Sequence, residues 1–363
     1  MDNIDDEWES FLSNDFNNLS IDNNTHNNNN NNEKNIIDST RDNNINNIPK
    51  SSPIYISTKT KILYLNTNLI DIKKVYWDIP IISYSSPRNG IIKKQIKFSS
   101  NCKEDIEDIN NKLSDVKYYE EHIIEHIENT EGRIKYKDQR KISIGISKKD
   151  ILSYRSKKKR AFFNCFVIIM RILINDEYKE IHIKVFNTGQ LEIPGIQHDN
   201  TLDQVLILLI NILKPFICDN LDYIKEKTET VLINSNFNCG YFINRDKLYN
   251  ILKYNYRINS NYDPCSYPGI QCKFYYDNTI PCDIQTGKQP NHKDYQKISF
   301  MIFRTGSVLI VGKCDENVLM LIYDYIKTLL SDEYANIFTE YSDNNVINKD
   351  RKKKIRKKTI LIV

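Results

Sequence analysis

The 363-residue chain is poor in glycine and proline, with ten of each, and no apolar run approaches the length of a membrane span. It does not open with the charged-then-apolar segment that is typical of a secretion signal. Its eight cysteines are irregularly spaced and form no C-x-x-C pair, so we expect free thiols rather than a disulfide framework. These absences predict a soluble intracellular protein with no membrane partner.

Motifs of catalysis and of nucleotide binding are also missing. The six histidines are scattered, and no H-E-x-x-H, G-x-S-x-G, Walker or G-x-G-x-x-G pattern occurs. One set of side chains has enough ligands for zinc but lacks the usual close ligand pair: Cys265, Cys272, Cys282 and His292. We therefore expect no enzyme, no cofactor and no bound metal.

The net charge of +4 is unevenly distributed along the chain. Residues 1–50 hold ten acidic and three basic side chains, whereas the segment Arg351–Lys358 (RKKKIRKK) holds seven positive charges. The remainder is only mildly basic, so charge alone is a weak argument for nucleic-acid binding. The basic segment is open to two readings, a solvated extension or a signal for nuclear import or phosphate binding.

The two ends of the chain differ in composition from the middle. Residues 1–50 are acidic and rich in asparagine, with an unbroken run over 27–32, and we predict that they are disordered. A short amphipathic opening is suited to docking on a partner, through Trp8, Phe11, Leu12 and Phe16. Residues 341–363 form the basic C-terminal tail.

The middle of the chain contains an internal repeat. The stretch FNTGQLEIPG begins at Phe186 and FRTGSVLIVG begins at Phe303, with Phe, Thr and both Gly at identical spacing. Each follows an alternating strand pattern and precedes a long apolar helix. Upstream, LNTNL (65–69) echoes INSNF (233–237). We assign residues 51–220 and 221–340 to two repeats, each built as strand, short helix, strands joined by a hairpin, and long helix.

This order predicts an α+β fold. Two such units pair naturally into one continuous antiparallel sheet with both long helices on one face, which leaves the other face as a binding platform. The first repeat carries a charged insertion at about 101–140, whose Ile and Tyr spacing predicts an amphipathic helical pair. Both surface embellishment and partner docking remain open for this insertion.

Three stretches of the second repeat resemble the C-terminal half of TATA-box-binding proteins (TBPs). They are YDPCSYPGI (262–270), MIFRTGSVLIVG (301–312) and INSNFNCG (233–240). The first repeat is similar more loosely, through IIMRI (168–172) and the FNTG stretch, so that the resemblance covers about residues 60–335. It looks like the TBP-like proteins of large eukaryotic DNA viruses, and it implies a TBP-like saddle: one curved antiparallel sheet with two long helices on its convex face.

In this family, aromatic side chains wedge between base steps of the minor groove and kink the DNA. Asparagines near the pseudo-dyad hydrogen-bond minor-groove acceptors, which do not distinguish A·T from T·A. The resemblance, extended by the repeat, implies DNA-binding roles for the wedges Phe303, Tyr267 and Phe186, the dyad residues Asn234 and Asn66, the basic residues Lys273 and Arg171, and Leu309.

The first repeat departs from the family pattern at several positions. Its upstream wedge position aligns with Cys165, and Phe163 or Phe166 replaces it only if the strand shifts register or bulges. Lys184, Glu192 and Pro194 replace apolar or small groove contacts, and Asn68 and Asn236 stand where the family has valines. A carboxylate that faces the groove adds repulsion where phosphates crowd, so the fold is expected to carry over better than the TATA preference.

The resemblance implies a transcription initiation factor that binds and bends AT-rich promoter DNA through the minor groove, as a monomer on double-stranded DNA. Its expected protein partners are a B-type general initiation factor, bound in part through Asp263, and the RNA polymerase machinery. The second acidic position of that docking site is Cys265 here. The alternative is a protein-interaction scaffold in transcription with weak or lost DNA binding. The expected location is a nucleus or a cytoplasmic viral factory.

Overall fold

The structure is a computed structural model that describes residues 48–152 and 162–340. The chain divides into two units, residues 1–47 and 48–363, and all described residues belong to the second. The predictions for the N-terminal tail, its amphipathic opening and the basic C-terminal tail concern segments outside the described residues.

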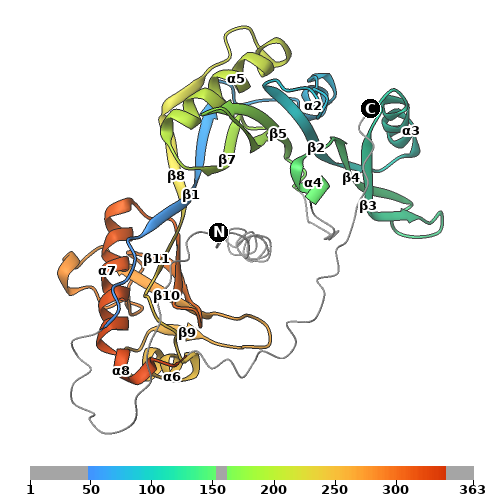
Figure 1. Cartoon of the computed structure of the whole chain (residues 1–363). Helices are drawn as coiled ribbons and strands as arrows, with labels where there is room; N and C mark the ends of the chain where they lie inside the picture. The colour runs from blue at the N-terminus through green and yellow to red at the C-terminus, as the bar shows by residue number, and fades with distance from the viewer. Residues whose placement is uncertain (1–47, 153–161, 341–363) are drawn as a thin grey trace, which may run out of the picture. The chain divides into compact units, whose positions relative to one another are not determined.

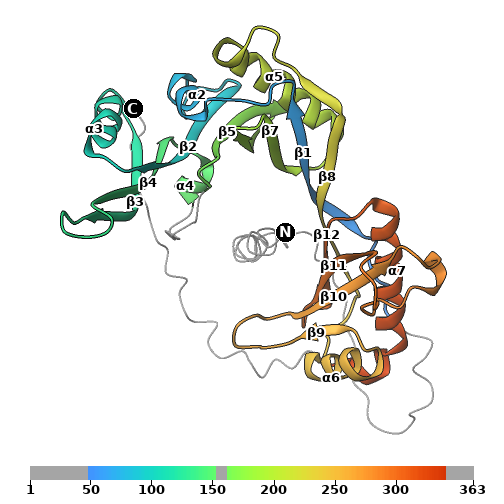
Figure 2. The same ribbon diagram turned by 180° about the vertical axis from the view of Figure 1, so that it is seen from behind.

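Outside the insertion of the first repeat, the order of strands and helices is the one predicted from the repeat (Figures 1 and 2). The first half contains β1 (Tyr55–Leu65), α2 (Ile72–Asp78), β2 (Gly90–Ser100), α3 (Lys103–Ser114), β3 (Tyr119–Glu128), β4 (Tyr136–Gly145), α4 (Lys148–Leu152), β5 (Cys165–Ile174), β6 (Glu177–Phe186), β7 (Gln190–Ile196) and α5 (Asp199–Ile217). The second half contains β8 (Tyr223–Asn238), α6 (Arg245–Asn250), η2 (Ile251–Asn255), β9 (Asn259–Asn261), β10 (Ile270–Asp277), η3 (Cys282–Ile284), β11 (Tyr295–Ile302), β12 (Ser307–Gly312), α7 (Glu316–Asp332) and α8 (Tyr334–Ile337).

The described strands form one twelve-stranded antiparallel sheet in the order β3-β4-β2-β5-β6-β7-β1-β8-β12-β11-β10-β9. Outward from the β1–β8 pair, the first half runs β7, β6, β5, β2 and the second half runs β12, β11, β10, β9. The two halves therefore have the same topology, and the predicted α+β class with a continuous antiparallel sheet is confirmed.

A local two-fold axis crosses the sheet between β1 and β8. The two-fold rotation maps each residue pair on one side of the axis onto a pair on the other side. The pair Thr58↔Asn234 maps onto Thr60↔Leu232, and the pair Tyr55↔Asn236 maps onto Ile62↔Glu229. The pair Lys59↔Ile233 corresponds to itself, so the axis passes through it. It follows that Thr60 is the equivalent of Asn234, and Ile62 the equivalent of Asn236.

The sheet has two chemically different faces. In β5, the residues Phe166, Ile168 and Met170 are buried in a core with α5, whereas Val167 and Ile169 point the other way. In β11, Ile298 and Phe300 belong to a second core with α7. We call the face that points away from α5 and α7 the second face.

Each long helix buries one apolar stripe. In α5 the buried residues are Leu202, Val205, Leu206, Leu209 and Leu213, and in α7 they are Val318, Leu319, Ile322, Tyr323, Ile326, Leu329 and Leu330. The spacing of three and four residues places each set on one side of its helix. Strand β1 joins the two cores, because Leu63 and Leu65 lie in the first while Ile54 and Ile56 pack on the second.

The expectation that no segment could cross a membrane needs a correction for α5. By length and composition alone this helix qualifies, with a mean hydropathy of 1.3 over 19 residues, and it is one such helix among the described residues. A single helix of this kind is weak evidence for a span, since a helix that packs on a core passes the same test. The buried stripe accounts for part of the apolar composition of α5, and Leu208, Ile210 and Ile212 pack, partly buried, against the same core.

The insertion at 101–140 also differs from the expectation. Its first part is the predicted amphipathic helix, α3, with Ile106, Ile109 and Leu113 buried in the first core. Its second part is a β-hairpin, β3–β4, not a helix. The apolar residues Ile123, Ile124 and Ile127 have helix-like spacing, and the strand arises from pairing with β4, not from a local alternation of polar and apolar residues.

Cross-strand ion pairs hold the hairpin together. Glu121 pairs with Arg140 at 2.6 Å, and Glu125 pairs with Lys137 at 2.9 Å. Asp138 is fully buried and accepts two hydrogen bonds from the Arg140 guanidinium at 2.6 and 2.7 Å, which lowers the pKa of its carboxyl below the ordinary value. Long-range pairing of this kind is not visible in the local sequence, so the helical reading of residues 119–128 was wrong.

The hairpin turns that precede β7 and β12 are identical in geometry. Gly189 and Gly306 both have φ of +78°, and each accepts a backbone N–H from the end of the neighbouring strand, from Leu65 and from Cys239 respectively. A Cβ atom on Gly306 would lie 2.3 Å from the carbonyl oxygen of Tyr241. The repeated Thr-Gly pair is therefore required by both conformation and space.

We expect Gly306→Ala to lower the free energy of unfolding by about 3 kcal/mol, because strain and a clash with a backbone carbonyl add. The matched control is Gly195→Ala: Gly195 has φ of +86°, but a Cβ there meets nothing within 4 Å. It should cost about 1 kcal/mol for the backbone conformation alone. Urea denaturation of both variants measures the difference, and equal losses would contradict the proposed clash.

Candidate nucleic-acid interface

Two aromatic rings meet at the second face in the second half of the chain. Phe303 follows β11 and donates its backbone N–H to Ser307, and Tyr267 lies in the turn before β10. Their ring centroids are 5.9 Å apart at an angle of 59°. A Cβ on Gly269 would lie 2.9 Å from the Phe303 ring and 3.0 Å from the Tyr267 ring, so glycine is what lets the rings approach the strand. Burial raises the pKa of the Tyr267 hydroxyl, which keeps it neutral.

The first half has an aromatic residue at each equivalent position. Phe186 corresponds to Phe303 through the identical hairpins, and it lies opposite Cys165. In the second half Ile270 lies opposite Ile302, which places Gly269 opposite Phe303. Cys165 is thus the equivalent of Gly269, and counting back two residues makes Phe163 the equivalent of Tyr267.

The strand register therefore decides between the two alternatives left open by the sequence. Phe166 is fully buried in the first core and cannot reach the second face. Phe163 is 44% exposed, and the Nζ atom of Lys97 lies 3.6 Å from its ring centroid. A register shift of two residues relative to the motif keeps the same face, and this shift was not visible in the sequence.

The same register separates the two basic residues that the motifs paired. Ile169, not Arg171, is the equivalent of Lys273, so the two basic residues do not occupy matching positions in the two halves. Arg171 is 8% exposed, and its guanidinium donates to the carbonyl oxygen of Tyr84 at 2.7 Å and to that of Ser86. Lys273 is exposed on β10. The Arg171 guanidinium binds carbonyl groups of the 83–86 loop, whereas the Lys273 side chain is exposed to solvent.

Asn66 and Asn234 are not brought to equivalent positions either. Asn66 lies beyond the end of β1, where its amide donates to Asn220 at 2.7 Å and accepts the backbone N–H of Asp222 at 3.0 Å. Asn234 lies on the second face one residue from the two-fold axis, and its buried Oδ1 has no hydrogen-bond partner among the described residues. The short motif LNTNL matched INSNF in letters, but Thr60 occupies the equivalent place.

The centre of the second face is asymmetric. Leu309 of β12 lies opposite Asn236 of β8, whereas their equivalents are Glu192 of β7 and Ile62 of β1. Glu192 forms an ion pair with Lys184 at 3.0 Å, and both side chains are largely buried. The second half thus presents leucine and an amide where the first half presents a charged pair and isoleucine.

Helix α4 lies on the second face of the first half, on the opposite side of β5 from α5 (Figure 1). The backbone N–H of Lys148 donates to both carboxylate oxygens of Glu180 at 2.9 and 3.0 Å. Asp150 pairs at 2.8 Å with Lys93, a lysine that is only 2% exposed. Burial would raise the pKa of Asp150, but Lys93 and Ser147 bind the carboxylate and lower it. A ligand on this half would meet α4 as well as the strands.

The turn of residues 262–268 carries the predicted partner-binding residue. Asp263 accepts the backbone N–H of Cys265 at 3.0 Å and the hydroxyl of Ser266 at 2.7 Å, and these bonds lower the pKa of its carboxyl. Cys265 is exposed. The acidic side chain thus also shapes the turn that precedes Tyr267.

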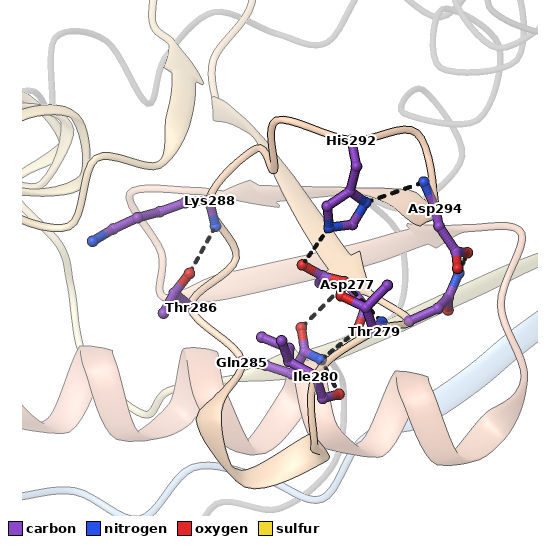
Figure 3. A network of polar contacts seen from close by, with 9 residues as sticks. Asp277, Thr279, Ile280, Gln285, Thr286, Lys288, His292 and Asp294 are labelled. Carbon is purple, nitrogen blue, oxygen red and sulfur yellow. Dashed lines mark hydrogen bonds and ion pairs between the residues drawn. The ribbon is translucent and has the colours of Figure 1, made fainter.

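The loop between β10 and β11 is closed by polar contacts (Figure 3). Asp277 accepts from Thr279 at 2.6 Å and contacts Nε2 of His292 at 3.0 Å, while Asn278 donates to Asp294 at 2.8 Å. His292 is therefore engaged within this loop rather than with the cysteines of the candidate zinc set. Cys272 is buried in the second core and Cys265 is exposed in the turn, and no metal-binding group occurs among the described residues.

We expect Arg171→Met to lower the free energy of unfolding by about 3 kcal/mol, because the carbonyl groups of the 83–86 loop lose their donors. Lys273→Met should change it by less than about 0.5 kcal/mol, since Lys273 is exposed. Chemical denaturation of both variants tests the contrast. An Arg171→Met protein as stable as the parent would show that the guanidinium does not hold this loop.

No family model matches the chain. The chain is similar to the "TATA-box-binding protein-like" protein of Acanthamoeba polyphaga mimivirus, with 30% identity over 203 residues, 52% of this chain and 53% of that protein. It thus spans about half the length of this curated relative. An alignment with the solved structure of Methanococcus jannaschii TBP covers 77% of this chain and 99% of that one, at 13% identity and a TM-score of 0.39. The chain is thus similar in sequence to a giant-virus protein described as TBP-like, and its own sheet is built from two halves of the same topology.

Proposed function

We propose that this chain is a non-enzymatic transcription initiation factor that binds and bends AT-rich double-stranded DNA. The second face of the sheet is the proposed contact surface and the minor groove its target. The TBP-like relationship supports the class, and the residues of the second face support the mode of binding.

The observation that carries the proposal is the ring pair Tyr267–Phe303, with its counterparts Phe163 and Phe186 in the other half. Four aromatic residues thus occupy two equivalent pairs of positions about the local two-fold axis. An aromatic ring inserted between base pairs replaces part of the lost base stacking with its own apolar face. Two such pairs, one in each half, are suited to kinking a duplex at both ends of a site.

The remaining chemistry of the second half is compatible with this role. Lys273 is exposed and is available to a phosphate. Asn234 lies on the second face beside the two-fold axis, where the Nδ2 group of its amide is suited to donate to the minor-groove acceptors of A·T pairs. Steps such as TA unstack at low cost, so an AT-rich site favours wedges. We include Leu309 as an apolar groove contact, and Arg171 and Asn66 only as supports of the surrounding loops.

The proposed partners are a B-type initiation factor and the RNA polymerase machinery. The exposed turn with Asp263 is the proposed docking site for the former, with Cys265 in place of a second acidic residue. We propose that the protein binds DNA as a monomer, since the chain supplies both halves of the sheet. A nucleus or a cytoplasmic viral factory is the proposed location.

The second candidate is a scaffold for transcription proteins that no longer bends DNA. It is favoured by the first half, where the Lys184–Glu192 pair and α4 occupy the second face. A carboxylate near the phosphates of a narrow groove is unfavourable, and Lys184 offsets that charge only while the pair persists. The two candidates differ in one measurable property, the bend in bound DNA.

The test uses the full chain and an AT-rich duplex with a fluorophore at each end. Phe303→Ala is expected to reduce the bend clearly while changing the association rate less than about twofold, because initial contact depends on charge and the wedge acts afterwards. The control is Phe338→Ala, which removes an exposed phenylalanine of the second core's periphery. Energy transfer between the ends reports the bend, and stopped-flow mixing reports association.

A strongly bent complex at submicromolar protein, with its bend lost in Phe303→Ala alone, supports the initiation factor. Unchanged bending in this variant would rule out the wedge assignment. Weak, unbent binding that disappears with modest salt would reflect phosphate contact only and would favour the scaffold.

A further inference from the structure

Three asparagines follow one another along the second face of β8. Asn234, Asn236 and Asn238 alternate with the buried residues Ser235 and Phe237. Their two-fold equivalents on β1 are Thr60, Ile62 and Tyr64. Two equivalent positions about the axis therefore carry different chemistry: Asn236 has an amide, whereas Ile62 has an aliphatic side chain.

The three amides differ in what they bind. Asn238 is used within the protein, since it donates to Ser307 and Thr305 at 3.3 Å each and accepts the backbone N–H of Gly240 at 2.7 Å. Asn236 lies between Tyr55 and Leu309 in the pairing of β8 with its two neighbours, and it is half-buried. Its side chain makes no hydrogen bond with any described residue. The amide of Asn236 is thus presented on the proposed DNA-binding face.

The minor groove carries one chemical feature that an amide distinguishes from an aliphatic side chain. A·T pairs present only acceptors there, whereas G·C adds the N2 amino donor of guanine. A primary amide has both an acceptor oxygen and donor hydrogens, so it satisfies either kind of pair. Isoleucine satisfies neither, and it leaves a guanine amino group buried without a partner, which is costly.

We infer that Asn236 accepts a hydrogen bond from the N2 amino group of guanine and makes the bound site tolerant of G·C in one half only. The base pair opposite Asn236 accepts G·C or A·T, while the pair opposite Ile62 requires A·T. The protein then binds an asymmetric site in one orientation. This specificity rests on the proposed minor-groove binding and deepens it.

Glu192 is another acceptor near the centre of the second face, besides Oδ1 of Asn234, and it does not duplicate the role of Asn236. Its carboxylate is held by Lys184 at 3.0 Å, and its two-fold equivalent is the apolar Leu309. It faces β1 beside Ile62, so any guanine contact from Glu192 would fall in the half opposite Asn236. The experiment therefore scans both halves of the site.

The probe is an AT-rich duplex bound by the full chain, in which each central A·T pair is replaced in turn by G·C or by inosine·C. Inosine·C has the hydrogen-bonding pattern of G·C in the major groove but lacks the N2 amino group, so the comparison isolates that group. The protein should bind A·T, inosine·C and G·C within about threefold of one another at one central pair. At the related pair across the axis, G·C should bind about tenfold more weakly than inosine·C.

The diagnostic variant is Asn236→Val, which keeps a strand-forming side chain but removes the amide. It should make G·C about tenfold weaker than inosine·C at the tolerant pair, because the N2 amino group loses its acceptor. A·T and inosine·C both lose the same amide donor, so their affinities should stay equal to each other. The matched control, Ile62→Val, should preserve the wild-type pattern. Tolerance that persists in Asn236→Val, or a wild-type protein that rejects G·C at every central pair, would overturn the inference.

Different results would contradict the proposed DNA binding and the proposed role of Asn236. If the full chain does not bind the unmodified AT-rich duplex, the proposed function fails and the scaffold is favoured. If it binds and bends that duplex but the Asn236 substitution does not alter discrimination between G·C and inosine·C, only the specificity inference fails. A Glu192→Leu variant removes the acceptor and gives β7 the side chain of its equivalent, Leu309. Loss of tolerance in this variant would show that tolerance arises in the other half, which would also contradict the role of Asn236.

Discussion

The antiparallel pairing of β1 with β8 is the contact on which the architecture depends. Without it the chain would be two separate α+β units, each with its own core and long helix. Backbone hydrogen bonds of the pair, together with the passage of β1 from one core to the other, make a single sheet of twelve strands among the described residues. The self-corresponding pair Lys59↔Ile233 then places the local two-fold axis on that sheet and determines every equivalence between the halves.

The backbone of the two halves is related by a two-fold axis, but the side chains on the second face differ between the halves. The turn glycines Gly189 and Gly306 share the same φ, because both halves need the same hairpin. The side chains of the second face are under no such constraint. One half presents Leu309 and an unpaired amide, whereas the other presents the Lys184–Glu192 pair and the α4 contacts. A duplex bound across the axis would therefore meet two unlike surfaces, which links the duplicated fold to directional recognition.

Much of the fold was predictable because short stretches of the sequence show which residues of each repeat form strands and which form helices. Strand alternation before each Phe-x-Thr-Gly stretch and the apolar period of the following helix determine the order of elements. The β3–β4 hairpin was not predictable in the same way. The apolar spacing of β3 is that of an amphipathic helix, and only pairing with the neighbouring strand, such as Glu121 with Arg140, makes this segment a strand. The apolar length of α5 likewise takes its meaning from the core on which it packs.

For the candidate site, the sequence motifs alone were enough to establish the resemblance and to name Phe186, Tyr267, Phe303 and Lys273 as candidates. The spacing within each short motif is enough for these, since each lies in a turn or strand that the motif itself defines. Only the tertiary structure decided that Phe163 takes the fourth aromatic position, that Arg171 holds a loop, and that Thr60 rather than Asn66 matches Asn234. Strand register sets these equivalences. Register depends on hydrogen bonds between strands that lie far apart in the chain, and a short sequence motif does not specify those bonds.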